Sequence, residues 1–156
     1  MTQDSRSISI SPLNSLHIQQ AKDSTFRLGN HFLKKHKQMQ AGRETRLYIA
    51  QLNDTKIVGA FWMEIQPTYC WIRNVFVESC HRHLGIGTKL LRYAIKENKN
   101  MSYYCFNTPS LHPFYQSIGF DEVLADELPN SLKTRLLRYQ ANGKNLIAMR
   151  FTTSLS

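Results

Sequence analysis

Apolar and polar residues alternate along several stretches of this chain, and each such stretch predicts a β-strand. Apolar residues spaced three and four apart instead predict amphipathic helices. On these patterns we expect strands over residues 7–10, 46–52, 56–66, 69–77, 102–107 and 146–151. We expect helices over residues 13–21, 24–38, 87–96 and 111–118, and a last one from the Pro129 region to Tyr139.

Two of the long strands are separated by Pro67-Thr68, which predicts a tight hairpin turn. In this register Gln66 pairs with Tyr69, and Glu64 lies across from Trp71. The apolar face of the hairpin then holds Phe61, Met63, Ile65, Cys70 and Ile72, which we expect in the core. The other face holds Trp62, Glu64, Trp71 and Arg73. This second face is too polar to be wholly core, and it is a candidate floor for an acceptor pocket.

A glycine-spaced loop follows the strand 69–77 and leads directly into a helix. Gly85 and Gly87 allow the backbone to approach an anion closely, and the helix start adds unpaired N–H groups and the positive end of a dipole. Arg82 supplies a side-chain donor. Placed between a strand and a helix, this loop predicts a pyrophosphate site. Nucleotide P-loops and Rossmann loops are excluded, because the residues after Gly87 have the wrong order and the third glycine is missing.

The spacing Arg82-x-x-Gly85-x-Gly87 resembles the acetyl-CoA motif of the GNAT N-acetyltransferase superfamily, written Arg/Gln-x-x-Gly-x-Gly/Ala. The strand before it, residues 75–79, is similar to the family's strand, with Ser79 in place of a proline. The segment 111–120 resembles the family's Phe-Tyr-x-x-x-Gly-Phe element. The resemblance covers residues 69–121. It implies an α/β (α+β) GNAT fold: a mixed central sheet of six to seven strands, splayed in the middle, with helices on both faces.

The same resemblance implies how acetyl-CoA, the co-substrate, binds. The pantetheine arm enters between the splayed strands, where Phe76 and Val77 supply backbone groups that lack ladder partners. The side-chain and backbone groups of the loop then bind the pyrophosphate. The loop residues are Arg82, His83, Leu84, Gly85, Ile86, Gly87 and Thr88. Asn107, at the end of the second splayed strand, is either a further CoA contact or a turn residue.

The catalytic groups are expected on different elements. Tyr115 matches the tyrosine that, in the family, is thought to protonate the departing thiolate, so the resemblance predicts it as the general acid. Phe114, Ile118 and Phe120 are expected in the core. A backbone N–H near Val77 can stabilise the oxyanion.

Glu64 can deprotonate or anchor the acceptor's ammonium, or it merely pairs with Arg73 across the sheet. Glu78 and a water chain are the alternative bases. No metal site is expected, because Cys80, His81 and His83 fall within the loop and have no distant ligand pair.

Length and composition fit one domain over residues 1–156, of which 42% are hydrophobic. No apolar run approaches the roughly 18 residues of a membrane span, and the first residues lack the apolar core of a secretion signal. Three cysteines without paired spacing favour reduced thiols and a cytoplasmic location. The protein is expected as a monomer or homodimer, without a membrane partner.

The formal charge of +9 is partly explained by a ligand with three phosphate groups. The remaining cations cluster at residues 34–37 and 133–150, as solvated helix faces or as a surface for nucleic acid or the ribosome. No aromatic-rich motif supports the second reading. We therefore predict an acetyl-CoA-dependent N-acetyltransferase acting on a primary amine. The alternatives are a macromolecular acceptor (a protein amine or RNA) and a non-catalytic acyl-CoA-binding module.

Overall fold

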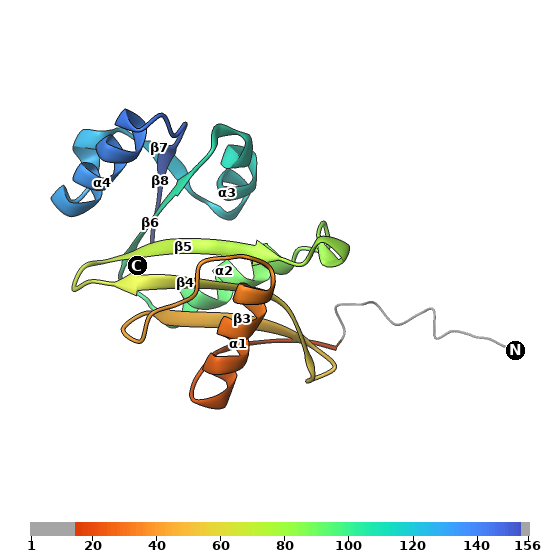
Figure 1. The fold of residues 1–156 in the computed structure, drawn as a ribbon. Helices are drawn as coiled ribbons and strands as arrows, with labels where there is room; N and C mark the ends of the chain where they lie inside the picture. The colour runs from red at the N-terminus through yellow and green to blue at the C-terminus, as the bar shows by residue number, and fades with distance from the viewer. Residues whose placement is uncertain (1–14, 154–156) are drawn as a thin grey trace, which may run out of the picture. The chain divides into compact units, whose positions relative to one another are not determined.

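The computed structural model describes residues 15–153, which form a seven-stranded mixed sheet in the strand order β2-β3-β4-β5-β6-β8-β7. β5 and β6 are parallel, whereas the pairs β2/β3, β6/β8 and β7/β8 are antiparallel. The elements are, in chain order, β2 (Leu16–Gln20), α1 (Ser24–Lys35), β3 (Arg46–Leu52), β4 (Lys56–Ile65), β5 (Tyr69–Val77), η3 (Ser79–His81), α2 (Ile86–Glu97), β6 (Ser102–Asn107), η4 (Pro109–Leu111), α3 (His112–Ile118), β7 (Asp121–Val123), η5 (Ala125–Glu127), α4 (Asn130–Ala141) and β8 (Ile147–Thr152) (Figure 1). The predicted mixed sheet is thus confirmed.

The helix predicted over residues 13–21 is wrong. Leu16–Gln20 forms the strand β2 and pairs antiparallel with β3, so that Leu16 lies opposite Leu52. The alternation of Leu16 and Ile18 with polar neighbours suits this strand, and pairing with β3 outweighs the local helix signal. The predicted strand over 7–10 and the first two residues of the predicted helix lie outside the described residues.

The other predicted elements are confirmed with small shifts at their ends. The helix predicted over 24–38 stops at Lys35. Lys37 has a φ of 59°, which is left-handed and cannot continue the helix. The Gln38 N–H turns back to the Leu33 carbonyl at 2.8 Å and closes the helix end.

The chain divides into two compact units. The first comprises residues 15–62 together with residues 74–94. On one face of its strands, Phe32 and Leu33 of α1 pack with Leu47 and Trp62. On the other face α2 approaches closely, because a Cβ on Gly59 would lie 3.2 Å from Ile86. Helices therefore cover both faces of the strands in this unit.

The second unit comprises residues 63–73 and 95–153. Leu132 and Leu136 of α4 pack against Trp71 on one face of its strands. The opposite face is aromatic. There the ring centroid of Tyr115 on α3 lies 5.5 Å from that of Phe120. The ring centroid of Phe120 in turn lies 5.5 Å from that of Phe151 on β8. This unit, too, has a helix on each face.

The parallel ladder between β5 and β6 is short. It joins Tyr69–Ile72 to Ser102–Cys105, although β5 continues to Val77 and β6 to Asn107. The ladder ends where the splay is predicted. Strand ends without a ladder partner are the backbone groups that an extended ligand can bind.

Candidate active site

The loop between β5 and α2 contains two residues with left-handed backbone, His83 at φ 66° and Gly85 at φ 82°. A Cβ on Gly85 would meet no atom within 4 Å, so the backbone conformation, and not crowding, requires glycine there. Gly87 is different, since it is the second residue of α2 and has no positive φ. It lies in the first turn of the helix, where N–H groups have no partner within the helix.

Arg82 folds back onto the end of β5. Its Nε donates a hydrogen bond to the Val77 carbonyl at 2.8 Å, and its guanidinium carbon lies 5.4 Å from the centroid of the Phe76 ring. The guanidinium is therefore held in place, while its Nη groups remain donors for an anion.

Near the end of β5, the backbone N–H and carbonyl groups of successive residues point alternately toward β4 and away from it. The Glu78 N–H donates to the Val58 carbonyl of β4 at 2.8 Å. Because backbone groups alternate along a strand, those of Phe76 also point toward β4, and those of Val77 point away from it. Of the two residues predicted to bind pantetheine, Val77 thus has its backbone groups on the open side. The Val77 carbonyl is already used by Arg82, which leaves the N–H.

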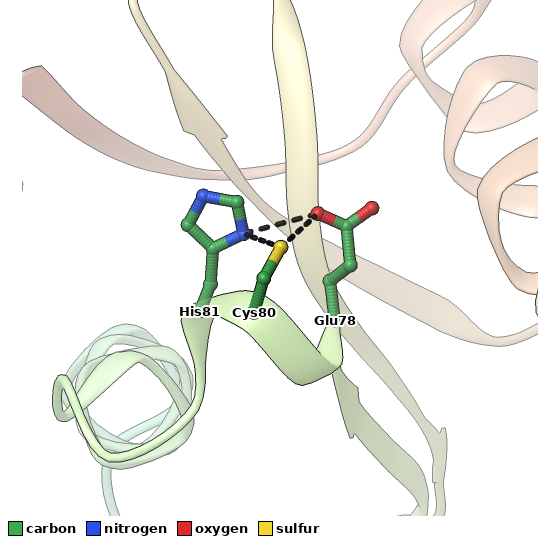
Figure 2. A group of neighbouring side chains, drawn as sticks. All are labelled: Glu78, Cys80 and His81. Atoms are coloured by element: carbon green, nitrogen blue, oxygen red, sulfur yellow. Dashed lines mark hydrogen bonds and ion pairs between the residues drawn. The ribbon is translucent and has the colours of Figure 1, made fainter.

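Glu78 is the centre of a polar cluster at the start of the loop (Figure 2). Its Oε1 lies 3.0 Å from Nδ1 of His81, 3.4 Å from Sγ of Cys80 and 3.5 Å from Nζ of Lys56. Its Oε2 lies 3.5 Å from Nε2 of His36. Burial by itself raises the pKa of the Glu78 carboxyl, but the Cys80 thiol, Lys56 and His81 outweigh it and hold the pKa below its ordinary value.

The cluster ties η3 to β4 and α1, and so anchors the loop. Glu78, Cys80 and His81 also each place one potential metal ligand within 4.8 Å of the others. The third member of this group is thus Glu78, whereas the sequence pattern had placed His83 beside Cys80 and His81. The Lys56 ammonium competes with any metal ion for the same carboxylate oxygen, so the hydrogen bonds and ion pairs account for the arrangement.

Glu78→Gln is expected to lower the melting temperature at pH 7 by about 3–8 °C, since a charge-assisted contact network is lost. A lowered carboxyl pKa stabilises the fold above the unfolded-state value of about 4.3 and stops doing so as pH falls through the folded-state value. The difference in melting temperature between the variant and the wild type should therefore become smaller below about pH 4. Thermal melts at several pH values test this, with the exposed Glu97→Gln as control. A gap that is constant with pH would contradict it.

Tyr115 lies on α3 and is 6% exposed. Gly119 ends this helix with a φ of 123°, and a Cβ there would lie 2.8 Å from the Phe151 ring. The predicted burial of Ile118 and Phe120 is confirmed, whereas Phe114 is only half-buried. Burial raises the pKa of the Tyr115 hydroxyl, and the nearby Cys105 adds to the shift. The hydroxyl therefore stays protonated at neutral pH, as a proton donor must.

Asn107 is 4% exposed at the end of β6, and both polar atoms of its side chain have local partners. Its Nδ2 donates to the Thr108 carbonyl at 3.1 Å, and its Oδ1 accepts from the Cys105 thiol at 3.5 Å. These contacts match a residue that ends a strand. A contact with CoA would have to replace one of them.

Glu64 lies on the polar face of the β4–β5 hairpin in the predicted register. The Gln66 N–H donates to the Tyr69 carbonyl at 2.8 Å, which confirms the turn at residues 67–68. Arg73 Nη1 donates to Glu64 Oε2 at 3.0 Å, so the ion pair considered as an alternative is formed. The Glu64 side chain is nevertheless 31% exposed, and it lines a cavity.

This cavity, of about 100 Å³, lies between the hairpin and α4. It is lined by Glu64, Gln66, Tyr69, Trp71, Ser131, Leu132 and Arg135. The hairpin pattern indicated Trp62, Glu64, Trp71 and Arg73 as a pocket floor, and of these Glu64 and Trp71 line the cavity. It did not indicate Ser131 or Arg135, because the sequence shows only that Arg135 belongs to a basic segment. The glycine loop and Glu78 belong to the first unit, whereas Glu64, Asn107 and Tyr115 belong to the second.

Comparison with known proteins identifies the class. A family model described as an acetyltransferase (GNAT) domain matches residues 43–122, about half of the chain. The chain therefore belongs to the GNAT acetyltransferases, as the two motifs predict. A search of curated proteins found no match. Within residues 15–153, every helix is too short or too polar to cross a membrane.

Solved structures match over most of the chain. An N-acetylglutamate synthase from Neisseria gonorrhoeae, complexed with coenzyme A and N-acetyl-glutamate, is 17% identical with a TM-score of 0.66, and the match covers 89% of this chain and 35% of that chain. The chain thus spans about a third of that enzyme's length. The ribosomal-protein-S18-alanine N-acetyltransferase from Escherichia coli is 15% identical with a TM-score of 0.66, covering 90% of this chain and 96% of that chain.

A GNAT family acetyltransferase from Elizabethkingia anophelis with acetyl-CoA bound is 15% identical with a TM-score of 0.60, covering 89% of this chain and 99% of that chain. At these identities the likeness establishes the fold. The predicted GNAT fold is thus confirmed.

Proposed function

We propose that this protein transfers an acetyl group from acetyl-CoA to a primary amine. The observation that carries the proposal is the loop in which Arg82 and the left-handed Gly85 directly precede the first turn of α2. A loop of this form suits a pyrophosphate, because it offers backbone N–H groups and a held guanidinium to one anion. The GNAT family match and a neighbour solved with acetyl-CoA support the choice of acyl donor.

In the proposed reaction the amine nitrogen attacks the thioester carbonyl, the new C–N bond forms, and the C–S bond breaks. The Val77 N–H stabilises the oxyanion, and Tyr115 gives the departing thiolate a proton. Residues 82–88 bind the pyrophosphate, with the backbone at the end of β5 near Val77 and the Asn107 side chain as further contacts. The ammonium proton leaves to Glu64, to Glu78 or to water.

The decisive experiment incubates the purified protein with acetyl-CoA and pooled amines, polyamines, amino acids or peptides, and measures CoA release. Release that depends on an acceptor supports the proposal. Tight acetyl-CoA binding without release for any pool would instead indicate a non-catalytic binding module. A lower turnover in Tyr115→Phe would argue against the non-catalytic alternative, whereas the burial of Tyr115 alone does not.

A macromolecular acceptor is the second candidate, and one surface favours it. A hollow of about 440 Å³ beside α1 is lined by Arg27, Lys34 and Arg43, and its described lining residues include no carboxylate. Such a surface attracts polyanions such as RNA or an acidic protein segment. If the small-amine pools fail and a peptide or RNA substrate works, this second candidate is the correct one.

Glu64→Gln is expected to weaken acceptor use while sparing acetyl-CoA binding, because it keeps the shape of the side chain and removes its charge. A base shows the defect mainly in kcat, with an alkaline shift of the rate profile, whereas an anchor shows it mainly in KM. Steady-state kinetics over pH, with calorimetry of acetyl-CoA binding, separates the two. Full activity with a lower melting temperature would mean that the ion pair with Arg73 is the whole role of Glu64.

A further inference from the structure

We propose that the cavity between the β4–β5 hairpin and α4 binds the carboxylate of the acceptor, so that the substrate is an amine of the amino-acid type. This inference rests on the proposed acetyl transfer and deepens it by assigning the class of acceptor. It concerns a cavity that lies wholly within the second unit.

The first observation is a buried donor without a partner. Trp71 is 3% exposed and lines the cavity, and its indole Nε1 has no hydrogen-bond partner. A buried N–H left unpaired is costly, and most such groups in folded proteins are satisfied by protein, water or ligand. The indole N–H can only donate, so what satisfies it must be an acceptor such as a carboxylate oxygen.

The second observation is an uncompensated cation. Arg135 lines the same cavity, and its guanidinium carbon lies 5.1 Å from the centroid of the Trp71 ring. Among the described residues no carboxylate pairs with Arg135. The other guanidinium at this indole, Arg73, is already bound to Glu64. Arg135 thus brings a planar guanidinium to the same side chain whose N–H lacks a partner, and both groups can donate to a carboxylate.

The N-terminus of α4 adds to this preference. Ser131, its second residue, lines the cavity, and its hydroxyl lies 2.8 Å from the Tyr69 hydroxyl. The first turn of α4 contains no acidic residue, and no side chain caps it. The positive end of this helix dipole is therefore available to an anion in the cavity.

The cavity also has one anionic wall, which suits the other half of the acceptor. Arg73 binds Oε2 of Glu64, and within the described chain Oε1 has no hydrogen-bond partner. An ammonium group can approach that oxygen. A ligand that carries a carboxylate and an amine matches both walls, whereas a simple amine leaves Arg135 and Trp71 unpaired.

The size of the cavity limits what it can hold. A volume of about 100 Å³ accommodates a few non-hydrogen atoms, such as the amine and carboxylate of an α-amino acid. A nucleotide base with its sugar is too large. The rest of a longer acceptor would have to lie outside the cavity.

The test compares matched acceptors with the full-length protein. CoA release is measured with a pool of the twenty L-amino acids and with a pool of their α-carboxamides, which keep the amine and the side chain but lose the carboxylate charge. The inference predicts turnover that is at least about 10-fold higher with the free acids, the effect of losing one charge-assisted contact. Equal turnover with both pools would overturn the inference and leave the proposed acetyl transfer intact.

Variants of Arg135 and Trp71, together with a control at Arg138, locate the effect. Arg135→Gln should raise KM for the best amino acid about 10- to 100-fold with little change for its carboxamide, and Arg135→Lys should restore part of the loss. Arg138→Gln removes the same charge from the same helix outside the cavity and should leave KM unchanged. Trp71→Phe removes the orphan N–H and should raise KM about 3- to 10-fold. An unchanged KM in Trp71→Phe together with a higher melting temperature would mean that the indole has no ligand.

A direct measurement of ligand binding distinguishes a failure of the cavity inference from a failure of the proposed acetyl transfer. If acetyl-CoA binds but no pool releases CoA, the proposed catalysis fails, and saturation-transfer NMR with the amino-acid pool decides the cavity by itself. Signals from free acids that are lost in Arg135→Gln support the inference. Equal signals from acids and carboxamides, or none from either, overturn it.

Discussion

Gly87→Leu is expected to abolish acetyl-CoA binding while the protein stays folded. Gly87 is the second residue of α2 and has no positive φ, so leucine suits the backbone and should leave the melting temperature unchanged or slightly higher. The leucine side chain would occupy the space through which the pyrophosphate approaches the first turn of the helix. Isothermal calorimetry with acetyl-CoA, together with a thermal melt, measures both effects.

The position of the substitution makes this test sharper than one at Gly85. Gly85 has a φ of 82°, so any side chain there strains the loop as well as blocking the ligand. Lys96→Leu, in a later turn of α2, introduces the same side chain away from the loop and should bind acetyl-CoA normally. An unchanged affinity in folded Gly87→Leu would show that the pyrophosphate does not bind at this helix.

Tyr115→Phe is expected to lower turnover by about 10²- to 10⁴-fold and to leave acetyl-CoA affinity unchanged, the usual effect of removing a positioned acid. The ring is buried at 6% exposure, and phenylalanine keeps its contacts with Phe114 and Phe120. Steady-state kinetics with a saturating acceptor measures the effect. Tyr139→Phe, on α4, serves as the control for loss of a tyrosine hydroxyl.

The pH profile provides an independent check. Burial holds the pKa of Tyr115 above its ordinary value, so the hydroxyl does not ionise below about pH 10. Any fall in the wild-type rate below that pH must come from another group, and Tyr115→Phe should lower the whole profile without removing that limb. Turnover close to wild type would mean that Tyr115 is a core residue and that water supplies the proton.

Local patterns in the sequence were sufficient for most elements and for the loop. Runs of apolar residues bounded by turn residues predicted β3 and β5 at their observed bounds, because this signal lies within the residues of each strand and its turns. The turn at residues 67–68 determined the hairpin register, and with it the shared face of Glu64, Trp71 and Arg73. Gly85 and Gly119 were informative for a similar reason, since both have a positive φ that glycine adopts without strain.

The tertiary structure decided what depends on partners distant in the sequence. Leu16–Gln20 forms a strand because it pairs with the edge of β3. The local sequence of residues 16–20 does not show that this pairing partner is present. Arg135 reached the cavity because α4 packs on Trp71, about sixty residues earlier in the chain, through contacts that a helical period does not specify. The Glu78 cluster likewise joins α1, β4 and η3. The sequence alone thus determined the family and the glycine loop before α2, whereas the proposed acceptor cavity depends on side chains that are distant in the sequence and meet only in the folded chain.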